Sequence, residues 1–168
     1  MAVGVVGRVP SQCWPVEKYR LLFDELHKTH PQIGFALIGG ADAKEAAKSI
    51  VEGICLGKHV IDFTGRTTLE QAASLMQKCV LYIGSNTGLM HMAVALSKPV
   101  VEIDFYLRDM DGRLNSPMGV WKSPAVILQK QGCDDCFEIC SKPYPHCIKQ
   151  ISVEEVLNAI IDMMRFDV

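Results

Sequence analysis

The sequence predicts an α/β fold, a Rossmann-like parallel sheet with helices on both faces. Two observations lead to this expectation. Short apolar runs of strand length alternate along the chain with segments of helical periodicity, which is the pattern of repeated βαβ units. Several of these runs end in polar turns that contain glycine, and ligands bind at such turns in parallel sheets. The length of 168 residues suits a single domain that covers the whole chain.

Six strands are expected because each run is short, apolar and bounded by turn-forming residues. Gly7 follows the first run, Gly39 and Gly40 follow the second, and Pro99 comes just before the fifth. These residues commonly mark the ends of strands. The expected strands are Val3–Val6, Ile33–Ile38, Val60–Phe63, Val80–Ile83, Val100–Ile103 and Ala125–Leu128.

Helices are expected between the strands. The segment Trp14–Lys28 has Pro15 near its start and a single apolar face. That face consists of Tyr19, Leu22, Phe23 and Leu26. Further helices are predicted at Asp42–Cys55, Thr67–Gln77 and Leu89–Leu96.

Two helix starts carry capping-box spacing, in which a hydroxyl residue stands three positions before an acid. Thr67 and Glu70 have this spacing, and so do Ser152 and Glu155, which precede an apolar stripe for the last helix. The segment Asp104–Ser123 has no clear period and contains glycine and proline, which indicates a long loop.

The composition is that of an ordinary globular protein, with 49% hydrophobic and 21% charged residues. A formal net charge of −2 gives no general electrostatic reason to bind nucleic acid or an acidic membrane. No apolar run is long enough to span a bilayer, and no secretory signal is recognisable. A cytoplasmic location is therefore expected.

The turn from Gly84 to His91 is the strongest candidate site. It joins an apolar strand to a helix, whose free backbone N–H groups and positive dipole end suit a phosphate. Gly88 leaves room for a close approach, Thr87 supplies a hydroxyl, and His91 lies one helical turn further on. The alternative is that Asn86 or Thr87 only caps the helix and that His91 is an ordinary surface histidine.

Other turns add candidates at the same edge. Arg8, after Gly7, places a cation there, Gly39 and Gly40 permit tight backbone geometry, and Arg66 follows Gly65 at a capped helix start. The alternative for Arg8 and Arg66 is an ordinary surface arginine, and Gly39 and Gly40 taken alone favour a simple turn. None completes the G-x-G-x-x-G fingerprint, so an oxidoreductase that binds a redox dinucleotide is disfavoured.

Metal sites are weaker candidates. Asp109 and Asp111, one residue apart, could hold a divalent cation on a sugar diphosphate, although such a short pattern is common in loops. Four clustered cysteines could bind structural zinc or remain reduced, and the three scattered ones (Cys13, Cys55 and Cys79) are expected to be small buried hydrophobes. The odd total of seven argues against a disulfide framework. The clustered cysteines are Cys133, Cys136, Cys140 and Cys147, with His146 adjacent to the last.

Several of these motifs, in the same order, resemble the second domain of the ADP-heptose:lipopolysaccharide heptosyltransferases, glycosyltransferase family nine. The stretch Ser85–Leu96, followed by Pro99 and a strand, resembles that family's S-N-D-S/T-G-x-x-H motif. Trp14-Pro15 resembles its K-x-W-P motif, and Phe63–Glu70 resembles its L-T-G-K-T-S-L turn. The C-terminal segment also resembles the family, through Cys133, Cys136, Cys147 and the stretch Ile151–Val156.

The resemblance implies one half of a GT-B glycosyltransferase, an enzyme with its active site between two Rossmann-like domains. This half would bind the donor, typically ADP-heptose, for inverting transfer to a lipopolysaccharide-type acceptor at the inner face of the membrane. The nucleotide sugar is then a substrate, and no cofactor or DXD metal is required. The expected donor-binding residues are Gly7, Arg8, Gly40, Gly65, Asn86, Thr87, Gly88, Leu89 and His91.

Three departures from the family pattern limit this expectation. Gln12 stands in place of the lysine before Trp14-Pro15, and Asn86 stands in place of an acid. The acceptor domain, where the general base is expected, is absent. A fragment, one half of a two-chain enzyme, and a short product that has become a non-catalytic nucleotide-sugar-binding or interaction module all remain open.

Overall fold

The computed structural model describes residues 1–7, 12–106, 123–131 and 147–165. Its centre is a six-stranded sheet in the order β3-β2-β1-β4-β5-β6, in which every neighbouring pair is parallel. The predicted parallel α/β sheet is therefore confirmed. The strands are β1 Ala2–Gly4, β2 Phe35–Ile38, β3 Val60–Asp62, β4 Tyr82–Gly84, β5 Val100–Tyr106 and β6 Ala125–Gln131.

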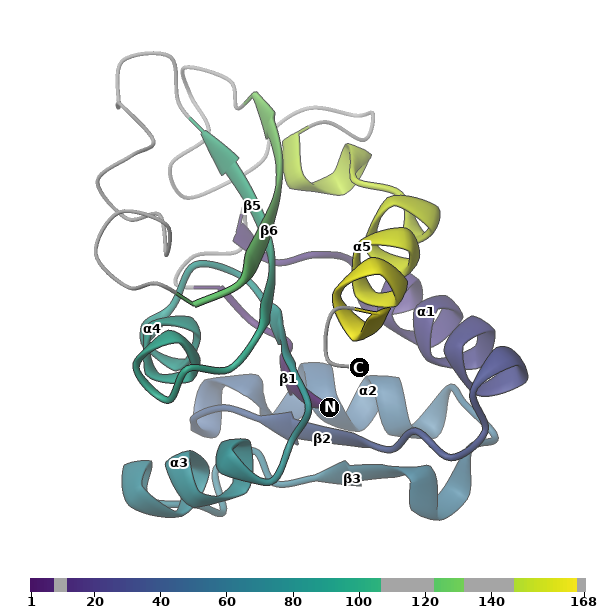
Figure 1. Ribbon diagram of the computed structural model, residues 1–168. Coiled ribbons are helices and arrows are strands. Elements are labelled where there is room, and N and C mark those ends of the chain that lie inside the picture. Colours follow the sequence, from purple (N-terminus) through teal and green to yellow (C-terminus); the bar gives the residue numbers. More distant parts are fainter. Residues whose placement is uncertain (8–11, 107–122, 132–146, 166–168) are drawn as a thin grey trace.

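Helices cover both faces of this sheet (Figure 1). The helices α1 (Val16–Thr29), α2 (Lys44–Glu52) and α5 (Val153–Arg165) contribute to the larger apolar core. The helices α3 (Leu69–Gln77) and α4 (Gly88–Ala95) contribute to a second core on the other face. Short 3-10 turns lie at Ala41–Ala43, Gly57–His59 and Cys147–Gln150.

Helix α1 buries the face that its periodicity predicts. Tyr19, Leu22, Phe23 and Leu26 are all fully buried. Phe23 stacks on Phe35 of β2, with ring centroids 4.0 Å apart. Burying these large side chains between α1 and the sheet supplies much of the hydrophobic stabilisation on this face.

The chain changes faces between β3 and β4, because α3 packs on the side opposite to α1 and α2. Strand β1 consequently lies between β2, which follows it, and β4, which begins the second half. In open parallel sheets such a reversal of strand order places a crevice at the carboxyl ends of the two central strands. The turns after β1 and β4 meet at that place.

One of the two predicted capping boxes is confirmed. Before α5, the backbone N–H of Ser152 donates to Glu155 Oε2 at 2.7 Å, and the Glu155 N–H donates to Ser152 Oγ at 3.1 Å. The box assigned to Thr67 and Glu70 is wrong by one residue. Thr68 and Gln71 form it instead, because α3 begins at Leu69.

Two other predictions are corrected. Asp104 does not open a loop, since β5 continues to Tyr106 and pairs with β6 along its whole length, with Asp104 opposite Gln129. Pairing with β6 satisfies backbone groups that a solvated loop would leave to water. Cys55 is exposed, not a buried hydrophobe, and Cys13 and Cys79 are only partly buried.

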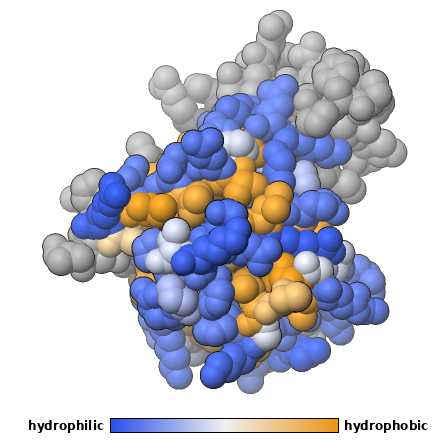
Figure 2. Space-filling model, turned by 90° about the vertical axis from the view of Figure 1, so that its right-hand side faces the viewer, coloured by the Kyte–Doolittle hydropathy of each residue, from blue (hydrophilic) through white to orange (hydrophobic). Residues whose placement is uncertain are grey.

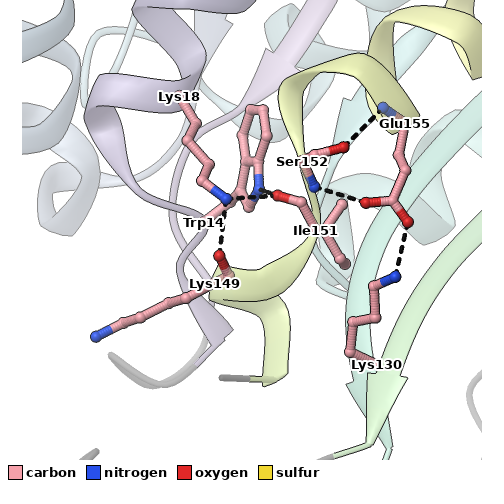
Figure 3. A network of polar contacts seen from close by, with 7 residues as sticks. All are labelled: Trp14, Lys18, Lys130, Lys149, Ile151, Ser152 and Glu155. Carbon is pink, nitrogen blue, oxygen red and sulfur yellow. Dashed lines mark hydrogen bonds and ion pairs between the residues drawn. The ribbon is translucent and has the colours of Figure 1, made fainter. Parts of the chain in front are cut away.

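Hydrogen bonds join the start of α1 to the segment before α5 (Figure 3). The Trp14 indole N–H donates to the Ile151 carbonyl oxygen at 3.0 Å. Lys18 Nζ donates to the carbonyl oxygens of Lys149 and Ile151, both at 2.7 Å. Glu155 then pairs with Lys130 Nζ of β6 at 2.7 Å, so one polar network joins α1, α5 and the edge strand.

Figure 2 views the molecule from the side where α1 lies, and shows apolar patches separated by hydrophilic side chains. Among the large apolar side chains of α1 and α2, Leu21 and Val51 are exposed. Isolated exposed residues of this kind are normal on a protein surface. Within the described ranges, no helix is long and apolar enough to cross a bilayer.

Candidate functional site

The turn between β4 and α4 presents an open helix start. Thr87 is the N-cap residue, with φ −140° and ψ 171°, and its side chain makes no capping hydrogen bond. Thr87 thus stands at the N-cap position of α4, but its hydroxyl does not accept a hydrogen bond from the helix. The first backbone N–H groups of the helix are not occupied by that hydroxyl, and they remain available to an anion.

Gly88 is the first residue of α4 and is exposed. An ideal Cβ built on Gly88 would have no other described atom within 4 Å, apart from its own helix backbone and chain neighbours. Space is thus open where a phosphate would have to approach. Leu89 and His91 follow, both half-buried, and the His91 backbone N–H donates to the Thr87 carbonyl oxygen at 3.2 Å. The expected one-turn spacing of Thr87 and His91 is confirmed.

The loop after β1 is joined to this turn. Ser85 Oγ donates to the backbone carbonyl oxygen of Gln12 at 2.7 Å, and the Gly7 N–H donates to Cys13 Sγ at 3.3 Å. An ideal Cβ on Gly7 would lie 2.6 Å from the same carbonyl oxygen, so the loop is tight enough to need glycine there. Gly7 and the β4–α4 turn are brought to one place, as expected, whereas Arg8 lies outside the described residues.

The turns after β2 and β3 form a neighbouring group. The Gly65 N–H donates to the Gly39 carbonyl oxygen at 2.9 Å, and Gly65 has φ +60°, a conformation that favours glycine. Gly40 is exposed beside it. An ideal Cβ on Gly65 would lie 3.2 Å from Lys44 Nζ, so an ammonium group covers this turn. Lys44 was not among the predicted site residues, because nothing in its sequence context marks it.

Buried polar residues lie directly beneath the β4–α4 turn, and the sequence analysis missed them. The strand register aligns Gly4, Gly84 and Glu102 across β1, β4 and β5. Glu102 is 1% exposed, and neither of its carboxylate oxygens has a hydrogen-bond partner. Asp104, two residues along the same strand, is 7% exposed. The sequence did contain one sign of this site, because Glu102 is an acidic residue within the apolar strand predicted at Val100–Ile103.

Burial is the main cause that raises the pKa of Glu102, to about 8, and the charge of Asp104 acts in the same direction. The Asn86 side chain favours the ionised form and lowers the pKa of Glu102, although it forms no hydrogen bond to either carboxylate oxygen in the structure. Asn86, a predicted donor-binding residue, therefore interacts with a carboxyl group whose charge state changes near neutral pH.

Tyr82 fills the space above the two aligned glycines. An ideal Cβ on Gly84 would lie 2.6 Å from the Tyr82 hydroxyl oxygen, and one on Gly4 would collide with the same atom. This hydroxyl is buried without a hydrogen-bond partner. Desolvation raises the pKa of Tyr82, while the Thr87 side chain lowers it without forming a hydrogen bond to the hydroxyl in the structure. Small residues at positions 4 and 84 thus let an aromatic side chain reach the base of the site.

The metal predictions receive no support from the described part of the chain. Cys147 is buried, but Cys133, Cys136 and Cys140 lie outside the described residues, as do Asp109 and Asp111. Across residues 1–7, 12–106, 123–131 and 147–165, no group of three or more His, Cys, Asp or Glu side chains could hold a metal ion. The zinc site stays a prediction.

Comparison with known proteins connects this geometry to one family. Residues 6–141 match Glycosyltransferase family 9 (heptosyltransferase). The chain is 31% identical over 96 residues to lipopolysaccharide heptosyltransferase 2 of Salmonella typhimurium, covering 56% of this chain and 27% of that protein. It is 32% identical over 103 residues to lipooligosaccharide heptosyltransferase 2 of Haemophilus ducreyi, covering 58% and 28% respectively.

Solved structures show the same fold at lower identity. The Escherichia coli ADP-heptose lps heptosyltransferase II superposes with a TM-score of 0.76 at 20% identity, covering 99% of this chain and 46% of that one. A family 9 glycosyltransferase from Veillonella parvula gives 0.77 at 22%, covering 98% and 46%. The Escherichia coli heptosyltransferase WaaC, solved with ADP, gives 0.70 at 21%, covering 96% and 43%. The chain spans less than half the length of each of these structures.

Proposed function

The chain belongs to glycosyltransferase family 9, and on that premise we propose that it is the donor-binding half of a heptosyltransferase. Its ligand is the diphosphate of a sugar nucleotide, ADP-heptose, and the intact enzyme transfers the sugar with inversion to a lipopolysaccharide-type acceptor. The observation that supports this most is the open amino end of α4, where the N-cap residue Thr87 makes no capping hydrogen bond and Gly88 is exposed. That WaaC was solved with ADP is consistent with the proposal.

In this proposal the diphosphate accepts hydrogen bonds from the first backbone N–H groups of α4. The helix dipole adds a favourable interaction with the anion. Thr87 and His91 supply side-chain donors, and the Gly7 loop, held by the Ser85–Gln12 hydrogen bond, forms the neighbouring wall. Gly40 borders the same edge of the sheet, as does Gly65, which Lys44 covers.

The chemical role of these groups is to stabilise the negative charge that grows on the departing nucleoside diphosphate. Donors that are held in place before the reaction serve this purpose, and losing one typically costs about 10²–10³ in rate. The general base belongs to the acceptor half in this scheme. The chain aligns with less than half of each solved relative, so we propose turnover only for the complete enzyme, at the cytoplasmic face of the membrane.

The sharpest test is Gly88→Ala, because no other described atom occupies the space into which the new methyl group would point. Alanine has a higher helix propensity than glycine, so the free energy of unfolding should stay equal or rise by up to about 1 kcal/mol. ADP affinity, measured by calorimetry, should nevertheless fall at least about tenfold, since the methyl group excludes the phosphate.

Thr87→Ala and His91→Ala test the side-chain donors. Each should weaken ADP binding by about tenfold to a hundredfold, the effect of losing a hydrogen bond to a charged group. The matched controls are Thr29→Ala and His30→Ala, at the far end of α1, which should bind ADP as the unchanged chain does. Equal affinity in Gly88→Ala, Thr87→Ala and His91→Ala would remove α4 from the site.

Substrate class and turnover need separate measurements. NAD should not bind, and NAD binding with an affinity comparable to that of ADP would favour an oxidoreductase instead. Transfer from ADP-heptose should appear only when an acceptor-half protein of the family is added. Tight ADP binding with no transfer in that mixture would favour a non-catalytic nucleotide-sugar-binding module.

A further inference from the structure

The base of the proposed donor site carries an acid that the transfer mechanism does not use. Glu102 lies beside Gly84 in the strand register, on the face of the sheet that α4 covers. Gly84 ends β4, and the next residues form the turn that leads into α4. The Glu102 carboxyl group is therefore beneath the turn that carries Asn86 and Thr87.

An isolated buried carboxylate is costly unless a proton, a cation or hydrogen-bond donors compensate its charge. Glu102 is 1% exposed, and neither oxygen has a hydrogen-bond partner. The other titratable groups of the described strands on this face are Asp104 on β5 and Tyr82 on β4, and His91 is the titratable side chain of α4. On β6 the positions opposite Glu102 and Asp104 are Ile127 and Gln129, which are uncharged.

Asp104 makes ionisation of Glu102 harder, because two buried carboxylates repel each other. A diphosphate at the start of α4 would add a third source of negative charge close by. The balance of these charges favours a neutral Glu102 when the donor is bound.

Asn86 connects this acid to the ligand. Its side chain lowers the pKa of Glu102, although neither Glu102 oxygen has a hydrogen-bond partner in the structure, and its amide group can present either two N–H donors or an oxygen acceptor. A carboxylate attracts the NH₂ group, which leaves the amide oxygen for the ligand side. A neutral carboxyl can donate to the amide oxygen, which leaves the NH₂ group for the phosphate.

We propose that Glu102 is a positioning residue that must be protonated for donor binding, so that Asn86 turns its NH₂ group toward the diphosphate. This inference rests on the proposed donor site at α4. Donor binding then takes up a proton at the Glu102 carboxyl group, and no other bond forms or breaks. Raising the pH removes this proton from the free protein and weakens binding.

The test is ADP affinity of the 168-residue chain across pH, by calorimetry in buffers of different ionisation enthalpy. The pKa of Glu102 is raised to about 8, so affinity should be close to its maximum at about pH 7 and should fall at least about tenfold by about pH 9.5. The terminal phosphate of ADP is already ionised throughout this range. Proton uptake should accompany binding near pH 8.

Three variants sharpen the test. Glu102→Gln is permanently neutral and retains a donor for the Asn86 oxygen, so its ADP affinity at about pH 9.5 should equal its own affinity at about pH 7. Asp104→Asn removes a charge that raises the pKa of Glu102, so the loss of affinity should begin at lower pH. Glu52→Gln, an exposed control at the end of α2, should keep the pH profile of the unchanged chain.

The outcomes separate this inference from the proposed function. ADP binding with a pH-independent affinity in the unchanged chain would overturn the role of Glu102 and leave the donor site intact. No ADP binding at any pH would overturn both. Binding that requires Mg²⁺, and loses this requirement in Glu102→Gln, would make the acids a cation site and would also overturn the inference.

Discussion

The indole N–H of Trp14 donates to the carbonyl oxygen of Ile151 at 3.0 Å, although the two residues are 137 positions apart in the chain. Lys18 donates to the same carbonyl oxygen at 2.7 Å. The tryptophan of the Trp14-Pro15 motif, 1% exposed, thus fixes the last helix to the first and does not point to a ligand.

Trp14→Phe should lower the free energy of unfolding by about 1–2 kcal/mol, through one lost hydrogen bond and some lost packing. The Ile151 carbonyl oxygen would still have Lys18 as its donor. Combining Trp14→Phe with Lys18→Met removes both donors to the buried Ile151 carbonyl oxygen. The free energy of unfolding of the double variant should therefore fall by at least about 0.5 kcal/mol more than the sum of the two single losses. Urea denaturation measures all three, and strict additivity would argue against a shared acceptor.

Glu155 should contribute to acid stability. Its hydrogen bonds to Lys130 and Ser152 lower its pKa from 4.5 to about 2. A carboxyl group whose pKa is lowered in the folded state stabilises the fold above about pH 4.5, and this contribution is lost as the pH falls toward 2. Because Glu155 and Lys130 are 39% and 35% exposed, solvent screening reduces the effect to about 1 kcal/mol.

Glu155→Gln retains a side chain able to complete the capping box, so it isolates the charge. The variant should be about 1 kcal/mol less stable than the unchanged chain at about pH 6, and the difference should vanish near pH 2. Glu154→Gln, the exposed neighbour on α5, serves as the control and should show no such convergence. Denaturation curves at several pH values test both, and a constant difference would contradict the lowered pKa.

The Tyr82 hydroxyl should determine how well alanine is tolerated at two glycines. Gly4→Ala directs its methyl group against Tyr82 alone, whereas Gly84→Ala also meets the Gly4 carbonyl oxygen at 2.8 Å. Each should cost about 1–3 kcal/mol through overpacking. Adding Tyr82→Phe should restore more of the lost stability in Gly4→Ala than in Gly84→Ala. In Gly4→Ala the new methyl group meets only the Tyr82 side chain, whereas in Gly84→Ala the contact with the Gly4 carbonyl oxygen remains. Equal recovery in thermal denaturation would show that the backbone contact is unimportant.

Two glycines with positive φ form a matched pair. Gly57 has φ +51° and no other described atom within 4 Å of an ideal Cβ, while Gly65 has φ +60° and lies under Lys44. Gly57→Ala should cost about 1 kcal/mol, from the backbone conformation alone. Gly65→Ala should cost about 1 kcal/mol more, because Ala41 and Lys44 must shift. Equal losses of unfolding free energy would mean that Lys44 moves freely.

Predictions from the sequence succeeded where a single local pattern determines the structure. The apolar stripe of α1 was assigned residue by residue, and the Ser152–Glu155 box was found, because both depend on spacing along one helix. The box at α3 was assigned one residue too early because Thr67 and Thr68 both offer a hydroxyl, and the start of the helix at Leu69 decides between them.

The base of the site was missed because it depends on pairing across strands. Glu102 lies in a sequence run that reads as an ordinary strand, and its importance appears only when β4 places Gly84 beside it. In the same way, Lys44 covers Gly65 through the packing of two turns that are twenty-one positions apart in the chain. Tertiary neighbours of this kind cannot be read from periodicity or caps.

The hydrogen bonds from Trp14 and Lys18 to the carbonyl oxygens at 149 and 151 also set an order of assembly during translation. The donors at the start of α1 are synthesised more than 130 positions before their acceptors. The wall of the proposed nucleotide site beside Ser85 therefore gains this support only after residue 151 has been added to the nascent chain.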